Sequence, residues 1–212
     1  MVAAARLKRA QDRVQAARPY SEKMREVMTG LASAAAGQVE HPLLENREVQ
    51  NTGFLLITAD RGLAGSYNSS IMRRAVEFSK DFDRVRQKWF IIGKKGNLFF
   101  RRREYNVVET LSVNSNNVTF GDAAEVTRVI RAAFEAGEID ELYIIYTKFQ
   151  SAMTQKPMVV KLLPIETPAG ESSSSADYIF EPEPAELLGE LLPRYLLNQV
   201  YQALLESIAS EH

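Results

Sequence analysis

The chain has 212 residues, of which 45% are hydrophobic, enough to bury one core of moderate size. Its 26 Lys and Arg residues nearly balance its 27 Asp and Glu residues, so no overall field attracts it to nucleic acid or an anionic membrane. The absence of cysteine excludes disulfides, thiolate metal sites and cysteine nucleophiles.

Residues 1–37 are rich in Ala, Arg, Glu and Gln and have the spacing of a helix. Their first apolar positions recur at steps of three and four, as in a coiled-coil seam: Leu7, Ala10, Val14 and Ala17. An amphipathic helix packed on its own domain explains this pattern equally well. Pro19 is expected to bend the helix or to mark a join.

From residue 50 to about 165, short β-rich runs alternate with helical ones, which is typical of a layered α/β domain. The expected strands are residues 54–58, 89–92, 106–110, 142–147 and 158–163. The last two have no room for a crossover helix between them, so they should form an antiparallel hairpin in a mixed sheet. Asp122 with Glu125 predicts a capping box for the helix before this hairpin, and Gly137 predicts its end.

The last part of the chain consists of a loop and a long helix. Four consecutive serines, residues 172–175, indicate a mobile surface loop. Helical spacing then continues to the last residue through Val200, Leu204 and Ile208, with Pro193 as an expected kink. We therefore divide the chain into an N-terminal helix with its connection, an α/β domain, a loop with a short extended segment, and a C-terminal helix: 1–49, 50–166, 167–184 and 185–212.

The stretch TADRGLAGSYNSS, residues 58–70, follows the first expected strand and precedes a helix, as a phosphate-binding loop does. It has only Gly62 and Gly65, without the Lys and hydroxyl of a P-loop or the third glycine of a dinucleotide loop. A tight turn is the favoured interpretation, with a helix cap at residue 68, 69 or 70. The stretch GKKG, residues 93–96, fails as a P-loop for the same reason and is also expected to be a turn.

The remaining candidates for chemistry are few. The two histidines, His41 and His212, have no metal-ligand spacing and suggest no catalytic triad. One basic run contains no acid: Arg84, Arg86, Lys88, Lys94, Lys95, Arg101, Arg102 and Arg103. It suits phosphates or an acidic protein surface, and a solvated edge of the domain suits it at least as well.

Several blocks, in order, resemble the γ subunit of rotary ATP synthases: ITADRGLAGSYNSSIMRRA, GKKGNLFFRRR, DELYIIYTKFQSAMTQKPMVVKLLP and DYIFEPEPAELLGELLPRYLLNQVYQALLESIASEH. The start, MVAAARLKRAQDRVQAARPY, resembles part of that family's N-terminal helix. The resemblance implies a Rossmann-like mixed-sheet α/β domain, flanked by terminal helices that pair as an antiparallel coiled coil. The chain resembles a bacterial form, shortened at both ends.

The resemblance also implies a function. The expected role is the central-stalk rotor of a proton-translocating ATP synthase, which couples rotation of the c-ring to the conformations of the catalytic β subunits. No catalytic, cofactor-binding or metal-binding residue is expected on this chain. The implied partners are the α and β subunits, the ε subunit and the c-ring, without nucleic acid. The implied location is the cytoplasmic face of the cell membrane, reached only through the c-ring.

Matching the family's motif implies two sets of contact residues. The c-ring candidates are Tyr178, Phe180 and Glu181. The stalk-pairing candidates are Leu7, Ala10, Val14 and Ala17 on one helix and Val200, Leu204 and Ile208 on the other. Two alternatives stay open: an independent α/β nucleotide-binding protein, and a helical adaptor that dimerises through its terminal helices.

Overall fold

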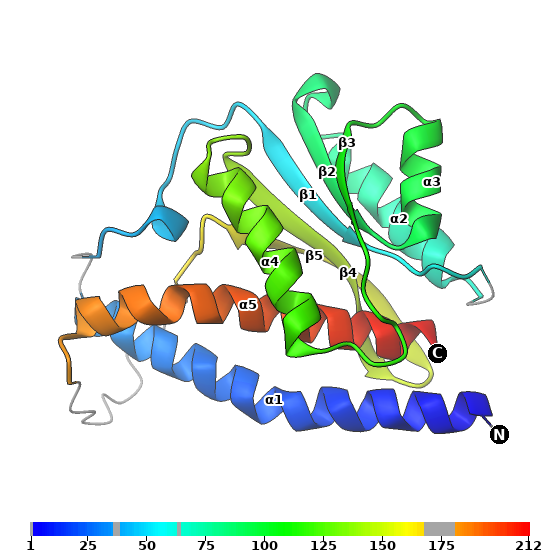
Figure 1. Cartoon of the computed structure of the whole chain (residues 1–212), viewed down its shortest axis with the longest axis horizontal. Coiled ribbons are helices and arrows are strands. Elements are labelled where there is room, and N and C mark those ends of the chain that lie inside the picture. The colour runs from blue at the N-terminus through cyan, green and yellow to red at the C-terminus, as the bar shows by residue number, and fades with distance from the viewer. Residues whose placement is uncertain (1, 36–38, 63–64, 168–180) are drawn as a thin grey trace.

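The computed structural model describes residues 2–35, 39–62, 65–167 and 181–212. It confirms an α/β fold with a mixed five-stranded sheet in the order β3-β2-β1-β4-β5 (Figure 1). The strands are β1 Thr52–Ile57, β2 Gln87–Ile92, β3 Val107–Leu111, β4 Glu141–Ser151 and β5 Thr154–Leu163. Strands β1 to β4 run parallel to one another, and β5 pairs antiparallel with β4.

Five α-helices accompany the sheet in the described part of the chain: α1 Val2–Ala35, α2 Tyr67–Ser79, α3 Lys94–Arg102, α4 Phe120–Glu135 and α5 Pro184–Glu211. Two short 3-10 helices, Pro42–Leu44 and Arg84–Arg86, lie in connections. The helix α1 continues through Pro19 and α5 continues through Pro193, so neither proline ends its helix.

The sheet is buried on both faces. Every residue of β1 is buried, and because side chains alternate along a strand, they divide between two cores. Phe54 and Leu56 pack with residues of α2 and α3, around the fully buried Trp89. Leu55 and Ile57 pack with residues of α4, α5 and α1. The fold therefore has three layers, and one of the two outer layers contains both terminal helices.

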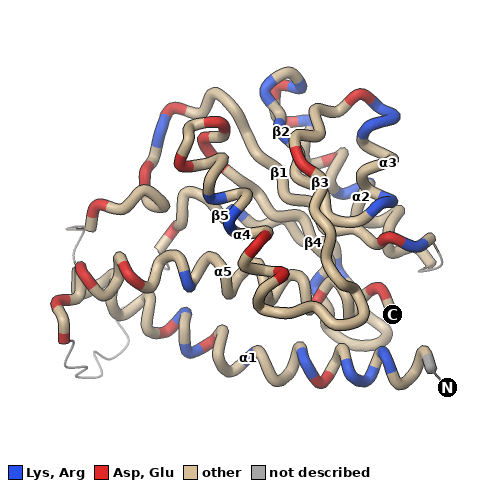
Figure 2. Tube along the Cα trace, in the orientation of Figure 1, with Lys and Arg blue, Asp and Glu red and all other residues tan. Residues whose placement is uncertain are grey.

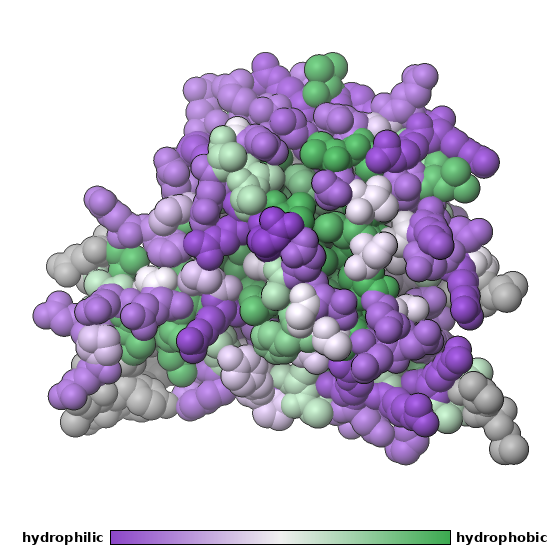
Figure 3. All heavy atoms as spheres, in the orientation of Figure 1, coloured by the Kyte–Doolittle hydropathy of each residue, from purple (hydrophilic) through white to green (hydrophobic). Residues whose placement is uncertain are grey.

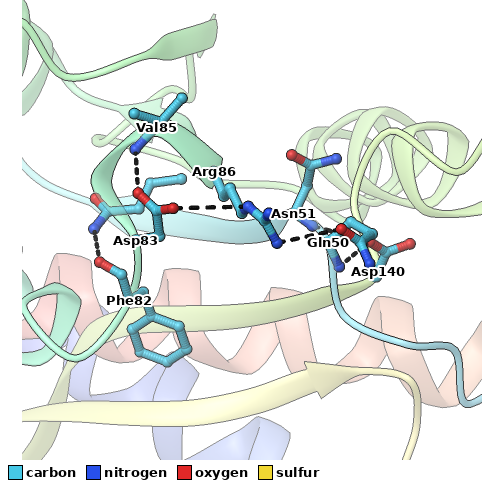
Figure 4. Close-up of polar contacts among 8 residues, drawn as sticks. Gln50, Asn51, Phe82, Asp83, Val85, Arg86 and Asp140 are labelled. Atoms are coloured by element: carbon cyan, nitrogen blue, oxygen red, sulfur yellow. Dashed lines mark hydrogen bonds and ion pairs between the residues drawn. The ribbon is translucent and has the colours of Figure 1, made fainter.

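Polar contacts at the amino ends of the parallel strands fix the entry to β1 (Figure 4). The Asp140 carboxylate, just before β4, accepts the N–H groups of Gln50 and Asn51 at 2.8 and 2.9 Å. Arg86 donates to the Gln50 side chain at 3.2 Å and forms an ion pair with Asp83 at 3.7 Å. Strands β1, β2 and β4 are thus linked by side chains as well as by the sheet.

All five expected strands are present, and the hairpin is antiparallel as predicted. Its strands are longer than expected, so most of the polar stretch at 150–156 is paired backbone around a short turn at Ala152 and Met153. Residues 150–156 are all exposed, so they lack the alternation of polar and apolar residues that would identify them as strand.

Two predictions about the boundaries of α3 and α4 were wrong. The capping box of α4 consists of Thr119 and Asp122, since the Asp122 N–H donates to the Thr119 hydroxyl and the Asp122 carboxylate accepts the Thr119 N–H. Glu125 instead binds Arg128, with a shortest distance of 2.6 Å. The stretch 93–96 is the start of α3, with Gly93 as its N-cap. The end of α4 before Gly137, which has a φ of +75°, agrees with the prediction.

Gly93 is required by both conformation and space. Its φ is +95°, and a Cβ atom there would lie 2.2 Å from the carbonyl oxygen of Thr58. Gly65 also has a positive φ, +51°, but an added Cβ would meet nothing within 4 Å. Substituting Gly65 would therefore cause backbone strain alone, whereas substituting Gly93 would cause strain and steric overlap.

Gly93→Ala is expected to lower the free energy of unfolding by about 3 kcal/mol or more, because strain and overlap add. Gly65→Ala is the matched control and should cost about 1–2 kcal/mol, from strain alone. Urea unfolding measures both. Equal losses in the two variants would contradict the close approach of Gly93 to the Thr58 backbone.

Candidate functional site in the paired terminal helices

The two terminal helices lie side by side and run in opposite directions, with the N- and C-termini at the same end of the pair (Figure 1). Helix α5 has three neighbours, because it also packs against α4 and β4. Helix α1 is on the outside of this arrangement. The base of the helix pair is therefore continuous with the α/β domain.

Hydrophobic residues fill the seam between α1 and α5. Val14, Val200 and Leu204 are almost completely buried, with 1%, 0% and 1% of their surface exposed. The other four residues expected at the seam are half-buried and pack against the same core: Leu7, Ala10, Ala17 and Ile208. The second half of α1 is buried more deeply, since Met28 and Leu31 have no exposed surface.

Polar residues also cross the seam, and the sequence did not reveal them. Asn198 on α5 has only 5% of its surface exposed, and it donates to the Ser21 hydroxyl on α1 at 3.0 Å. The Ser21 hydroxyl donates in turn to Gln202 at 3.4 Å. A buried amide with a partner on one side fixes the register of a helix pair, because sliding the helices would leave it unpaired.

Further polar contacts attach α5 to the carboxyl-terminal part of β4. The buried Glu206 accepts the N–H of Phe149 at 3.2 Å, and Ser207 accepts the N–H of Thr147 at 3.4 Å. Burial and the nearby Glu206 carboxylate raise the pKa of Tyr146 on β4 to about 12. Strand β4 extends beyond its parallel neighbour β1, and α5 satisfies backbone donors in this extension.

The connection between β1 and α2 lies where parallel α/β sheets bind nucleotides. The chain moves outward from β1 to β2 and then returns to β4 on the other side, so β1 and β4 enclose the point at which strand order reverses. Ligands of such folds bind outside the carboxyl ends of the strands at this point. Under α5, the space lined by residues at the ends of β1 and β2 is about 20 Å³, which is room for a single water. A larger polar groove of about 420 Å³ lies farther out, between the start of α2, β4 and the end of α5.

Helix α5 fills this position. Leu204, Ser207 and Ile208 line the small cavity together with residues that follow β1 and β2. The buried Tyr67 at the start of α2 also lines it, and burial raises the pKa of its hydroxyl. Glu211, in the last turn of α5, faces Asp60, and burial and that carboxylate raise its pKa.

The N-terminus of α3, which in such folds is available to phosphate, is occupied by the chain itself. Its first three N–H groups donate to the loop after β1: to the Asp60 carboxylate at 2.9 Å, the Ala59 carbonyl at 3.2 Å and the Thr58 hydroxyl at 3.0 Å. The TADRG stretch is thus a cap for a neighbouring helix, which supports the turn interpretation.

The helix cap predicted at residues 68–70 was wrong. Helix α2 begins at Tyr67 with Ser66 as its N-cap, and no side chain caps it. Asn68 instead holds the loop: its carbonyl oxygen accepts the Ala59 N–H and its amide donates to the Arg61 carbonyl, both at 3.0 Å. Asn68 does bind backbone groups, as a capping residue would, but these groups belong to the loop and not to the first turn of α2.

The c-ring candidates and the basic run lie outside the seam of the helix pair or outside the described residues. Tyr178 and Phe180 are outside them, and Glu181 is exposed just before α5. In the basic run, Arg84 stacks on Tyr105 at 3.2 Å and Arg103 on Phe99 at 3.7 Å. These cations have partners within the chain, which favours the solvated edge.

The described residues contain no group of three or more His, Asp or Glu residues able to hold a metal ion. None of the helices in the described ranges is both long and apolar enough to cross a membrane. The face seen in Figure 3 is hydrophilic around its rim, and hydrophobic residues are visible mainly in the middle.

Comparison with known proteins covers the whole chain. A family model described as ATP synthase matches residues 1–212. The ATP synthase gamma chain of Brevibacillus brevis is 43% identical over 213 residues, covering 100% of this chain and 74% of the relative. That of Moorella thermoacetica is 45% identical over 212 residues, with the same coverage of both chains.

Solved structures similar to this chain also come from ATP synthases. A chain in the central stalk and c-ring structure of the Tetrahymena thermophila mitochondrial ATP synthase has a TM-score of 0.72 at 25% identity, covering 100% of this chain and 91% of that one. A rotor chain of the Euglena gracilis mitochondrial ATP synthase has a TM-score of 0.57 at 17% identity, covering 97% and 86%, and supports the fold alone.

Val14→Asp is expected to lower the free energy of unfolding by about 3 kcal/mol or more, because it removes buried apolar surface and places a carboxylate in the seam. Gln15→Asp adds the same charge to the exposed neighbouring position and should cost less than about 1 kcal/mol. Thermal or urea unfolding compares the two. A Val14→Asp variant as stable as Gln15→Asp would show that α1 does not pack at this seam.

Proposed function

The chain belongs to the ATP synthase gamma-chain family, as a central-stalk rotor subunit, and from this premise we propose that it carries rotation between the c-ring and the catalytic head. Catalytic sites of this complex lie on other subunits. In the proposal, this chain performs no chemistry and acts by its shape and stiffness.

The observation that carries the proposal is the position of α5. A rotor must transmit torque from the part held by the ring to the helices that reach the head, and a flexible joint between them would absorb the rotation. In this chain α5 shares a hydrophobic core with both the sheet and α1. Close-packed interiors resist deformation, so the domain and the base of the helix pair turn as one body.

The asymmetry of the rotor supports its proposed action on the catalytic head. The helix pair consists of two antiparallel helices of different sequence, so it has no threefold symmetry about its axis, and the α/β domain lies on one side of it (Figure 1). An asymmetric shaft meets each of the surrounding β subunits with a different face. Rotor angle and nucleotide affinity are then linked by a coupling free energy, which acts in both directions. Proton flow drives synthesis, and hydrolysis drives the reverse rotation.

The proposed partners follow from this role. The helix pair meets the α and β subunits of the head, the ε subunit docks on the flank of the α/β domain, and the far end rests on the c-ring. The chain is then a peripheral component at the cytoplasmic face of the membrane and reaches the membrane only through the ring. Seven residues are proposed to form the base of the stalk: Leu7, Ala10, Val14, Ala17, Val200, Leu204 and Ile208.

We place the c-ring contact at Tyr178, Phe180 and Glu181. Two aromatic side chains and an acid suit a contact that is packed on one side and charged on the other. Glu181 is exposed and lies three residues before the start of α5, so a force applied there reaches the buried helix through a short segment.

The test uses the assembled ATP synthase in membrane vesicles, with ATP hydrolysis and ATP-driven proton pumping measured on the same sample. Replacing all three residues, as Tyr178→Ala, Phe180→Ala and Glu181→Gln, should preserve hydrolysis and lower the protons pumped per ATP, because the rotor turns without its grip on the ring.

Glu183→Gln is the matched control. Glu183 is an equally exposed acid two residues away whose side chain forms no cap bond with α5, so pumping should be unchanged. Unaltered coupling in the triple variant, or equal loss in the control, would refute the contact at these residues.

A further inference from the structure

A second cavity, of about 210 Å³, lies beside the helix pair and adjoins the filled crevice, with which it shares Ser115 and Ile208. Three elements enclose it: the N-terminal turns of α1, the loop from β3 to α4, and the end of α5. Its polar lining consists of Arg6, Arg9, Arg13, Ser115, Asn116 and His212. Lys and Arg residues of α1 gather at this end of the helix, next to the C-terminal end of α5 (Figure 2).

The charge in this cavity has one sign. The three arginines lie on one face of α1, at steps of three and four. No Asp or Glu lines the cavity, and the ion pairs formed among the described residues do not include any of the three. Asp12, the nearest acid along the helix, pairs with Lys8 at 3.8 Å instead.

One of the arginines is already held in place. The Arg13 guanidinium donates to the carbonyl of Val118 and, at 3.3 Å, to the side chain of Asn117. The Tyr201 hydroxyl on α5 lies 3.5 Å from it. The Arg13 side chain on α1 therefore contacts both the loop and α5. A ligand in the cavity would meet a fixed cation rather than a flexible one.

The other donors around the cavity are short or neutral. Ser115 is half-buried and Asn116 is exposed, and their side chains offer a hydroxyl and an amide N–H. Burial and the neighbouring Arg6 lower the pKa of His212, so its imidazole contributes an N–H donor without adding positive charge at pH 7. The lining thus offers hydrogen-bond donors from several directions, and no Asp or Glu side chain in it competes with an anion.

We propose that this cavity binds a phosphate group, with Arg6 and Arg9 as its main charged ligands and Arg13 as a donor held in a fixed position. Guanidinium groups match phosphate oxygens in pairs, which favours this oxyanion over chloride. Bringing several guanidinium groups together without a counterion is unfavourable, and a bound phosphate relieves this repulsion. Inorganic phosphate and the phosphate tail of a nucleotide offer the same chemistry to such a site.

Binding would connect α1, α5 and the loop before α4 at the end of the described helix pair. A ligand that binds only the folded arrangement stabilises it by mass action, so phosphate would stiffen the base of the stalk. This role is independent of the coupling function proposed above, since it requires only the isolated chain.

The experiment titrates the purified protein with inorganic phosphate and, separately, with magnesium-free ATP, by calorimetry, at an ionic strength held constant with sodium chloride. Saturable binding is expected, together with a rise in the thermal midpoint. Tighter binding of inorganic phosphate would identify the free ion as the source, and tighter binding of ATP would identify a nucleotide.

The double variant Arg6→Gln/Arg9→Gln should weaken binding by about tenfold or more, equivalent to about 1.4 kcal/mol. Both side chains are exposed, so the fold is retained. Lys8→Gln removes a charge from the same turn of α1 but lies outside the cavity, and it should leave the affinity nearly unchanged. Absence of saturable binding by either ligand, or equal weakening by Lys8→Gln, would overturn the proposal.

Discussion

The structure depends on the burial of α5 among three neighbours. Helix α1 covers one side, α4 another, and β4 a third. Leu192, Leu196 and Val200 along this helix have no exposed surface, although α5 follows the α/β domain in the sequence. Removing α5 would expose the face of the sheet formed by Leu55 and Ile57 as well as the inner side of α1, so the domain and the helix pair cannot be stable as separate units.

The same helix explains why a fold common among nucleotide-binding proteins has another use here. Strand order reverses between β1 and β4, and a binding crevice would open at their carboxyl ends. Leu204, Ser207 and Ile208 fill it, and the Asp60 carboxylate takes the place of a phosphate at the N-terminus of α3. The polar groups that would hold a ligand instead hold the chain together. The fold acts as a scaffold, and its function depends on surfaces and stiffness.

Much of this arrangement could be predicted from the sequence. Strong local patterns gave the five strands and the long helices, because alternation and helical spacing reflect burial directly. The wrong predictions concern polar residues, whose partners depend on tertiary structure. Asn68 resembles a helix cap and binds a loop, and Glu125 resembles a capping partner and pairs with Arg128. The buried Asn198 and Glu206 were not detected, since nothing in a helical tract distinguishes a buried polar residue from an exposed one.

The central claim is that the α/β domain and the base of the helix pair form one rigid body, and native-state hydrogen exchange tests it most directly. The account predicts that the slowest amides of α1 and α5, around Val14 and Leu204, exchange with the same free energy as those of β1 and β2, because all open only in global unfolding. Amides of the helix pair that exchange with a much lower free energy than the sheet would show a separable stalk and contradict the account.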